Sequence, residues 1–362
     1  MDISTDIDLA LREATALFPP EQMFVLCDTS TFKLCLPVVR RTLSIDDRNV
    51  LVLPAGEDIK TLVGSQTIWH FLKENNATRH SLLICLGGGV ITDMGGFAAS
   101  TYMRGMAFLN IPTTLLSMVD ASIGGKTGID FEGIKNIIGL FKMPQKTILH
   151  TPFLRSLPAE EFLSGYAEMI KHTLISSPLQ VAALSAFDLD KWFTEEQSAH
   201  ITNKSEQESE LADLILRSVE IKRYIVESDP EENGMRQTLN FGHTIGHALE
   251  AFSIERSDKK PLRHGYAVLY GMIAELWLSH IKFNFQTKDI EPLISLMKEY
   301  YGKAECSCAN YNDLINLMRH DKKNPQSDQI TFTLLHSIGN YRLQCVCTED
   351  EIKEALDFLF NT

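Results

Sequence analysis

Short apolar segments alternate with helical patterns along the first 150 residues of the chain. Each segment spans four or five residues between turn-forming residues, which is typical of strands buried on both faces of a parallel sheet. The segments cover residues 24–27, 50–53, 82–86 and 107–111. Between the second and third, residues 59–75 repeat apolar side chains at helical spacing. This alternation predicts an α/β domain with a Rossmann-like, doubly wound sheet over residues 1–151.

The pattern becomes helical after this domain. Helices are predicted for residues 162–174, 211–226, 240–250, 265–278, 290–300, 311–318 and 349–360. Residues 330–335 and 341–346 predict a β-hairpin, and the acidic stretch 195–210 predicts a loop or a solvent-exposed helix. The second domain, residues 152–362, is therefore expected to be mainly α-helical.

Composition narrows the class of protein. A chain of 362 residues is long enough for two domains. The net charge of −13 argues against a nucleic-acid partner, and an anionic substrate would need a local basic cluster. Neither a membrane-length apolar run nor a signal-peptide pattern is visible. The seven cysteines lack zinc-finger spacing and suit free thiols in a reducing compartment, so we expect a cytoplasmic protein without a membrane partner.

A histidine pair suggests metal chemistry. His243 and His247 are four residues apart and would project from one face of a helix, and His264 precedes the next apolar helical stretch. Two histidines with one further ligand make an open, catalytic type of metal site. The alternative is a helix with one partly buried and one solvent-facing histidine.

Two glycine-rich segments are candidates for anion binding. Residues 87–89 connect a predicted strand to a predicted helix, where backbone N–H groups face an anion. The GxGxxG pattern is absent, and a tight turn with positive φ is the alternative. Asp28 ends the first strand and is a candidate for a ribose hydroxyl, or an ordinary surface aspartate. Residues 124–127 read GGKT without the complete P-loop pattern, since Asp120 stands where a glycine is required, but their lysine suits a phosphate or carboxylate.

Seven motifs in fixed order carry a resemblance to a known family. They are GGGVITDMGGFAASTYMRG, IPTTLLSMVDASIGGKTGID, KNIIG, GYAEMIKH, LNFGHTIGHALE, LRHGYAV and MRHDKK. With them the chain resembles the 3-dehydroquinate synthases, which are NAD-dependent sugar-phosphate cyclases of the shikimate pathway. The resemblance implies conversion of 3-deoxy-D-arabino-heptulosonate 7-phosphate, a phosphorylated keto acid, to 3-dehydroquinate and phosphate. The implied steps are transient oxidation by NAD, phosphate elimination, re-reduction and an intramolecular aldol closure. A homodimer and an active site in the cleft between the domains are implied as well.

The resemblance also implies roles for individual residues. A divalent metal (Zn²⁺ or Co²⁺) would be bound by Glu168, His243 and His264, so that the histidine pair supplies only one ligand. NAD would be bound by Asp28, Glu57, Lys60, Gly89, Val90, Ile91, Thr92, Asp93, Thr113, Thr114, Lys126 and Lys135. The substrate phosphate would be bound by Lys126, Lys135, Asn136, Arg104, His247 and one of Lys322 or Lys323. The carboxylate would be bound by Lys222 and Arg236, and the ring hydroxyls would face Asp120, Lys171 and Asn240.

Three positions depart from the family pattern. Thr92 replaces a glycine, which predicts a tighter phosphate turn, and Ala121 replaces a small hydroxyl residue. The segment Asp130-Phe131-Glu132 adds two carboxylates near an expected anion site. The alternatives are a sister cyclase that makes an inosose or valiolone-type ring, a metal-dependent polyol dehydrogenase, and a non-catalytic binding protein.

Overall fold

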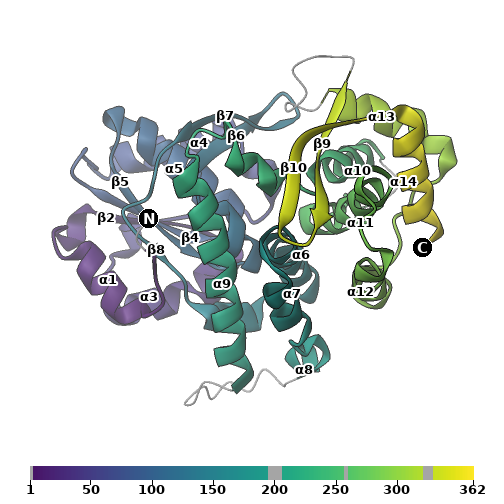
Figure 1. Cartoon of the computed structure of the whole chain (residues 1–362). Helices are drawn as coiled ribbons and strands as arrows, with labels where there is room; N and C mark the ends of the chain where they lie inside the picture. Colours follow the sequence, from purple (N-terminus) through teal and green to yellow (C-terminus); the bar gives the residue numbers. More distant parts are fainter. Residues whose placement is uncertain (1–2, 195–205, 257–259, 321–328) are drawn as a thin grey trace. The chain divides into compact units, whose positions relative to one another are not determined.

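The computed structural model describes residues 3–194, 206–256, 260–320 and 329–362 (Figure 1). The chain forms two compact units, Met1–Phe162 with Leu189–Val219, and Leu163–Asp188 with Glu220–Thr362. Helices α6 (Ala159–Ser176) and α9 (Glu206–Ser228) contribute residues to both units. The sequence predicts one boundary after residue 151, and separate domains on either side of it remain a prediction.

The first unit is built on a six-stranded sheet in the order β1-β8-β5-β4-β2-β3, and every pairing in it is parallel. Its strands are β1 (Ile3–Ser4), β2 (Met23–Asp28), β3 (Val50–Leu53), β4 (Leu82–Gly87), β5 (Ala107–Pro112) and β8 (Thr147–Ile148). Its helices include α1 (Ile7–Thr15), α2 (Thr29–Leu34), α3 (Leu36–Thr42), α4 (Leu62–Glu74), α5 (Gly89–Thr101) and α8 (Leu189–Thr194). The four predicted strands and the α/β class are confirmed.

The central strands β2, β4 and β5 are buried on both faces of the sheet. Alternate residues of β2 and β4, such as Phe24 and Cys85, share one core with Ile68 of α4 and Met94 of α5. The residues between them, such as Val25, point to the opposite face and are just as buried. Burial on both faces explains why these strands are continuous apolar runs rather than alternating patterns.

A second, two-stranded sheet in this unit was not predicted from the sequence. Strands β6 (Lys126–Phe131) and β7 (Ile134–Phe141) form an antiparallel hairpin. Glu132 and Gly133 connect them, and both have positive φ (49° and 79°), as a two-residue hairpin turn requires. The Asp130 carboxylate accepts the Asn136 N–H at 2.7 Å and closes the turn. The departure at residues 130–132 is thus part of a hairpin.

The second unit is mainly helical, as predicted. Its elements include α7 (Pro178–Ser185), α10 (His243–Glu255), α11 (His264–Phe283), α12 (Glu291–Leu296), α13 (Tyr311–Arg319), β9 (Ile330–Ser337), β10 (Asn340–Cys347) and α14 (Glu349–Asn361). The predicted β9–β10 hairpin is confirmed, and β9 contacts α11, where the Leu335 N–H donates to Ser279 Oγ at 3.0 Å (Figure 1).

Two predicted helices of the second half need correction. Asn240 belongs to a 3-10 turn (Met235–Asn240), and the helix expected from residue 240 begins at His243. The stretch 290–300 divides into α12 and a π-helical turn (Met297–Tyr301) because the hydrogen-bonding pattern changes along it. Of the acidic stretch 195–210, the first eleven residues lie outside the described residues, and the rest begins α9. Within the described ranges no helix has the length and apolar character needed to cross a bilayer.

Candidate active site

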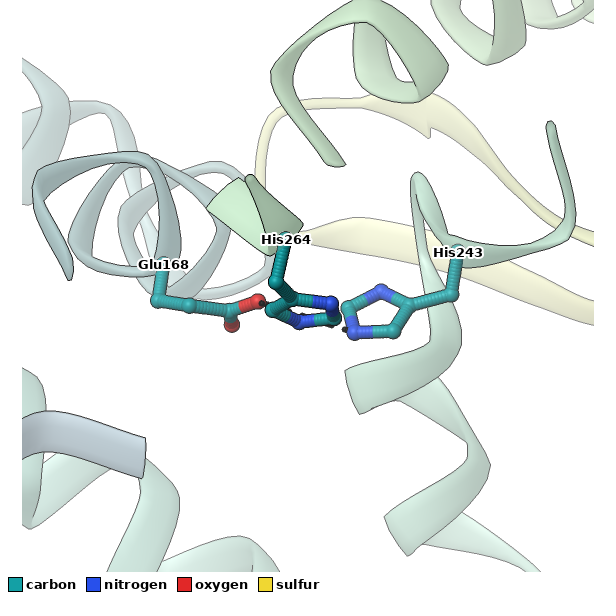
Figure 2. Close-up of side chains that lie close together, drawn as sticks. All are labelled: Glu168, His243 and His264. Carbon is teal, nitrogen blue, oxygen red and sulfur yellow. Dashed lines mark ion pairs between the residues drawn. The ribbon is translucent and has the colours of Figure 1, made fainter. Parts of the chain in front are cut away.

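Three side chains of the second unit converge on one point. Glu168 comes from α6, His243 from the start of α10 and His264 from the start of α11. One ligand atom from each lies within 4.8 Å of the other two, and Figure 2 shows both rings turned toward the carboxylate. Glu168 Oε1 is 3.6 Å from His243 Nε2 and 3.3 Å from His264 Nε2.

Glycine allows α11 to reach α6 at this point. A Cβ on Gly265 would lie 2.0 Å from the Ser164 carbonyl oxygen, so no other residue fits there without displacing the backbone. The Gly265 N–H also donates to Ser164 Oγ at 3.0 Å. Because Ser164 is one helical turn before Glu168, this contact sets His264 beside the carboxylate.

Glycine also places the second histidine. Gly242 has φ 78°, a left-handed conformation that turns the chain from the 3-10 segment into α10. His243 follows as the first helical residue and is buried. Its Nδ1 lies 3.1 Å from the Phe241 carbonyl oxygen. Since a carbonyl only accepts, Nδ1 carries a proton, and Nε2 is the ring nitrogen that faces Glu168.

His264 is oriented in the same way, by a carboxylate. Its Nδ1 lies 3.1 Å from Glu250 Oε2, and its Nε2 faces Glu168. Burial lowers the pKa of His264, but its hydrogen bonds to Glu168 and Glu250 raise it by more, to about 10. A metal ion at Nε2 would have to displace a proton, and metal binding should release protons to the solvent.

The donor set fits a divalent transition metal. Two imidazole nitrogens and one carboxylate oxygen converge, and each histidine uses its other nitrogen on an oxygen acceptor, as metal-bound histidines do in proteins. Three protein ligands leave coordination positions for a substrate. Lys171 forms an ion pair with Glu168 Oε2, and both side chains are fully buried.

His247 lies beside this group without belonging to it. Its ring centroid is 5.2 Å from that of His243 and 6.1 Å from that of His264. The two histidines of the HxxxH pair do share one helix face, as the spacing predicts. The third member of the close group is nevertheless His264 rather than His247.

The remaining predicted residues of this unit have contacts of their own. Arg236 is buried, and its guanidinium donates to the Pro230 carbonyl at 2.8 Å. Lys222 is buried on α9. Asn240 donates to the Glu232 carboxylate at 3.3 Å, a partner that the motifs did not indicate. Lys322 and Lys323 lie outside the described residues.

The glycine turn of the first unit adopts ordinary backbone angles. None of its three glycines has positive φ, so the tight-turn alternative is wrong. A Cβ on Gly87 would lie 2.6 Å from the Ile91 side chain, and one on Gly88 would lie 3.0 Å from Thr114. The glycines therefore let the start of α5 approach its neighbours and leave its first N–H groups uncovered by side chains. This arrangement suits a pyrophosphate.

Thr92 does not tighten this turn, because it is already inside α5. Its hydroxyl is buried, lies 3.3 Å from that of Ser117, and donates to the Gly89 carbonyl at 3.2 Å. Thr113 is held beside the turn, where its N–H donates to the Gly87 carbonyl at 3.1 Å.

Charged cofactor candidates of the first unit form two ion pairs. Lys60 contacts Asp93 at 2.7 Å, and Lys135 contacts Glu57 at 2.9 Å. Burial lowers the pKa of Lys60, but Asp93 and two further carboxylates raise it by more, so Lys60 remains charged.

Asp28 has a local structural role. Its Oδ1 accepts the N–H groups of Ser30 and Thr31 and caps α2. Parallel pairing of β2 with β4 brings it next to the glycine turn, at the point where the chain connections change direction across the sheet.

The GGKT segment leads into a strand. Gly124 and Gly125 have positive φ (115° and 68°), and Lys126 begins β6 with its side chain exposed. A P-loop lysine would enter a helix, so the structure agrees with the exclusion of that motif. Among the other candidates, Asp120 lies in a π-helical turn (Ser117–Ala121), and Arg104 has φ 66° at the end of a 3-10 turn.

Two buried glutamates near the histidines were missed by sequence reasoning. Glu250 lies seven residues after His243, which places it on the same face of α10. Glu275 is the single acidic residue of α11, which is otherwise largely apolar. For Glu275, the signal in the sequence was a single carboxylate within a largely apolar helix.

Solved structures share this fold along nearly the whole chain. A 2-epi-5-epi-valiolone synthase from Streptomyces hygroscopicus subsp. jinggangensis 5008, with NAD⁺ and Zn²⁺ bound, is 22% identical, with a TM-score of 0.82 and coverage of 99% of this chain and 95% of that chain. A 2-deoxy-scyllo-inosose synthase in complex with carbaglucose-6-phosphate, NAD⁺ and Co²⁺ is 19% identical, with a TM-score of 0.76 and coverage of 98% and 95%. These likenesses show that the chain has the same fold as these two cyclases.

Sequence comparison gives the family. The 3-dehydroquinate synthase N-terminal model matches residues 50–164, and the C-terminal model matches residues 165–324. The 3-dehydroquinate synthase of Parabacteroides distasonis is 42% identical over 356 residues, which cover 98% of this chain and 96% of that protein. The chain belongs to the 3-dehydroquinate synthase family.

Proposed function

We propose that this chain converts 3-deoxy-D-arabino-heptulosonate 7-phosphate to 3-dehydroquinate and phosphate. The observation that carries the proposal is the convergence of Glu168, His243 and His264 in a chain that matches 3-dehydroquinate synthases over nearly its full length. The convergence supports a metal site at which a substrate hydroxyl can be activated, and family membership supports the choice of substrate.

The proposal assigns the two cofactors to different units. NAD would be bound by the start of α5 and by residues around the two ion pairs of the first unit. A divalent metal would be held by Glu168, His243 and His264 of the second unit. When bound, NAD would accept and return a hydride, and the metal would acidify the hydroxyl that is oxidised.

The chain's own side chains would bind and orient the substrate. Lys171 neutralises Glu168 Oε2, which leaves Oε1 as the oxygen that faces the histidines. His247, next to both rings, would contact the phosphate, with Lys126, Lys135, Asn136 and Arg104 of the first unit. Lys222 and Arg236 would pair with the substrate carboxylate, which the substrates of hexose-phosphate cyclases lack.

A direct assay tests the activity. The purified protein is incubated with the keto acid phosphate, NAD⁺ and Zn²⁺, and inorganic phosphate is followed with time. We expect phosphate release without net NADH accumulation, because the hydride returns to the substrate. Turnover of glucose 6-phosphate instead would indicate a sister cyclase, and NADH accumulation with glycerol would indicate a polyol dehydrogenase.

Ligand variants connect the activity to the site. We expect Glu168→Ala and His264→Ala to lose bound metal and phosphate release together, each by more than the roughly 10–100-fold typical of residues that only support a ligand. Metal content is measured by atomic absorption after dialysis. Full activity with one bound metal in either variant would remove that residue from the site.

A further inference from the structure

Helices α10 and α11 each carry one proposed metal-binding histidine and one buried glutamate. Glu250 lies on α10 with His243, and Glu275 lies on α11 with His264. Each glutamate, however, contacts the other helix. Each carboxylate is therefore carried by one helix and contacts the start of the other.

Glu275 covers the start of α10. Its Oε2 accepts the Gly242 N–H at 2.7 Å, and its Oε1 accepts the N–H groups of Thr244 and Ile245 at 3.1 and 3.2 Å. These donors belong to the first turn of a helix, where backbone N–H groups lack partners within the helix. The N-cap residue is Gly242, which has no side chain to bind them. The Glu275 carboxylate therefore takes the place of an N-cap side chain for α10. His243 lies in sequence between Gly242 and Thr244, whose N–H groups this carboxylate accepts.

Glu250 makes the opposite connection. From α10 it reaches the first residue of α11 and lies 3.1 Å from His264 Nδ1. A carboxylate at this nitrogen fixes the tautomer and the plane of the ring, and it increases the basicity of Nε2.

The two helices are close enough for both connections because glycines line the contact between them. A Cβ on Gly271 would lie 1.9 Å from the Gly242 carbonyl oxygen, and one on Gly246 would lie 2.9 Å from the Ala267 carbonyl oxygen. At this separation, the glutamate side chains can reach backbone and ring atoms of the opposite helix directly.

We propose that Glu250 and Glu275 are positioning residues that form a reciprocal brace, each holding the metal-binding histidine of the opposite helix. The inference rests on the proposed metal site and adds two residues to its construction. A buried carboxylate is costly unless its partners are well placed, and Glu275 has three backbone donors directly beside His243. The brace predicts that metal affinity depends on two side chains that bind no metal themselves.

The test measures Co²⁺ affinity by competition with a chromophoric chelator in the full-length protein. Glu250→Gln keeps an acceptor of the same shape but removes the charge, and Glu275→Gln removes one of the two acceptor oxygens. We expect about 10–100-fold weaker Co²⁺ binding in each variant and an altered visible absorption spectrum of the bound Co²⁺. The spectrum reports ligand geometry, which a general loss of stability would leave unchanged.

Two control variants separate positioning from folding. Glu255→Gln removes an exposed carboxylate at the end of α10. Ser279→Ala removes a buried hydroxyl of α11 that donates to the Glu275 carbonyl at 2.7 Å and accepts from Leu335. Both should keep the wild-type affinity and spectrum, even if Ser279→Ala unfolds at a lower urea concentration.

The possible results are distinguishable. Wild-type affinity and spectrum in both glutamine variants would overturn the brace and leave the metal site in place. Equal weakening in the control variants would overturn it too, because loss of stability would then explain the effect. Failure of the wild-type protein to bind Co²⁺ would overturn the metal site and the proposed function with it. If Glu275→Gln does not fold, Glu250→Gln alone tests the brace: an altered Co²⁺ spectrum would support it, and a wild-type spectrum would overturn it.

Discussion

Single atoms decide several features of the candidate site. The Nδ1 atoms of His243 and His264 each face an oxygen acceptor, which fixes the nitrogen that is available to a metal. Lys126 presents a different case. It has an exposed side chain, follows two glycines with positive φ and belongs to the first unit, away in sequence from the histidines. We expect its main contact to be with the substrate phosphate, although the resemblance also places it among the NAD-binding residues.

Lys126→Ala should therefore impair phosphate binding selectively. A charge-assisted hydrogen bond contributes about 1.5–3 kcal/mol, so we expect kcat/KM for the keto acid phosphate to fall by roughly 10–100-fold. NAD⁺ affinity, measured by fluorescence titration, should stay close to that of the wild-type protein. Unchanged kinetics would remove Lys126 from the anion site, and a matching loss of NAD⁺ binding would assign it to the cofactor.

Some residues of the candidate site could be predicted from the sequence, and others could not. The sequence indicated His243 with His247 by their spacing and His264 as a further histidine nearby. The family resemblance was needed to suggest Glu168 and to choose His264 over His247 as a ligand, because Glu168 lies 75 residues before His243 and gives no local signal. The roles of Glu250 and Glu275 could not be predicted, because they depend on how α10 packs against α11. Asp28 was visible as a strand-end aspartate, but its capping of α2 depends on backbone geometry.

At the scale of elements, the contact between α10 and α11 is unusually close because glycines occupy it. Gly271 shows which of two opposed effects dominates. Alanine is favoured over glycine in a helix by about 1 kcal/mol, but a methyl group 1.9 Å from a carbonyl oxygen forces the two helices apart.

Gly271→Ala should consequently destabilise the protein. Overpacking of this kind costs about 1–3 kcal/mol, which exceeds the gain in helix propensity. The change is measured as a lower midpoint of urea unfolding, together with weaker Co²⁺ binding, because the displaced helices carry the two histidines. A midpoint equal to or above that of the wild-type protein would show that the helices can separate without strain.

The elements that the sequence predicted well are those with strong periodicity. Strands β2, β4 and β5 are buried on both faces, and α11 is apolar almost throughout. The β6–β7 hairpin was missed because the apolar residues of β7 are mostly exposed and do not alternate, and because the turn depends on Glu132 adopting positive φ. The start of α10 was placed three residues early because the turn at Gly242 was not recognised.

At the scale of the molecule, the proposed cofactors bind to different units. The glycine turn and the two ion pairs belong to the first unit, and the three proposed metal ligands belong to the second. Each cofactor should therefore stabilise its own surroundings first.

Hydrogen–deuterium exchange can map the two effects separately. A ligand at 100 times its Kd stabilises its site by about 2.7 kcal/mol, so exchange there should slow by up to roughly 100-fold. Adding Zn²⁺ to chelator-treated protein should slow exchange at the starts of α10 and α11, and adding NAD⁺ should slow it at residues 87–93. Zinc protection confined to the parallel sheet would contradict the assignment of the metal to the second unit.

The interleaving of the two units affects the order of events during synthesis on the ribosome. Glu168 leaves the ribosome 75 residues ahead of His243 and 96 ahead of His264. At about 5–20 residues per second, that interval is roughly 4–20 s. The segment Leu189–Val219, which completes the first unit, emerges within this interval, before either histidine. The nascent chain can therefore complete its parallel-sheet unit without the metal, and the metal can join only after α11 has begun to emerge.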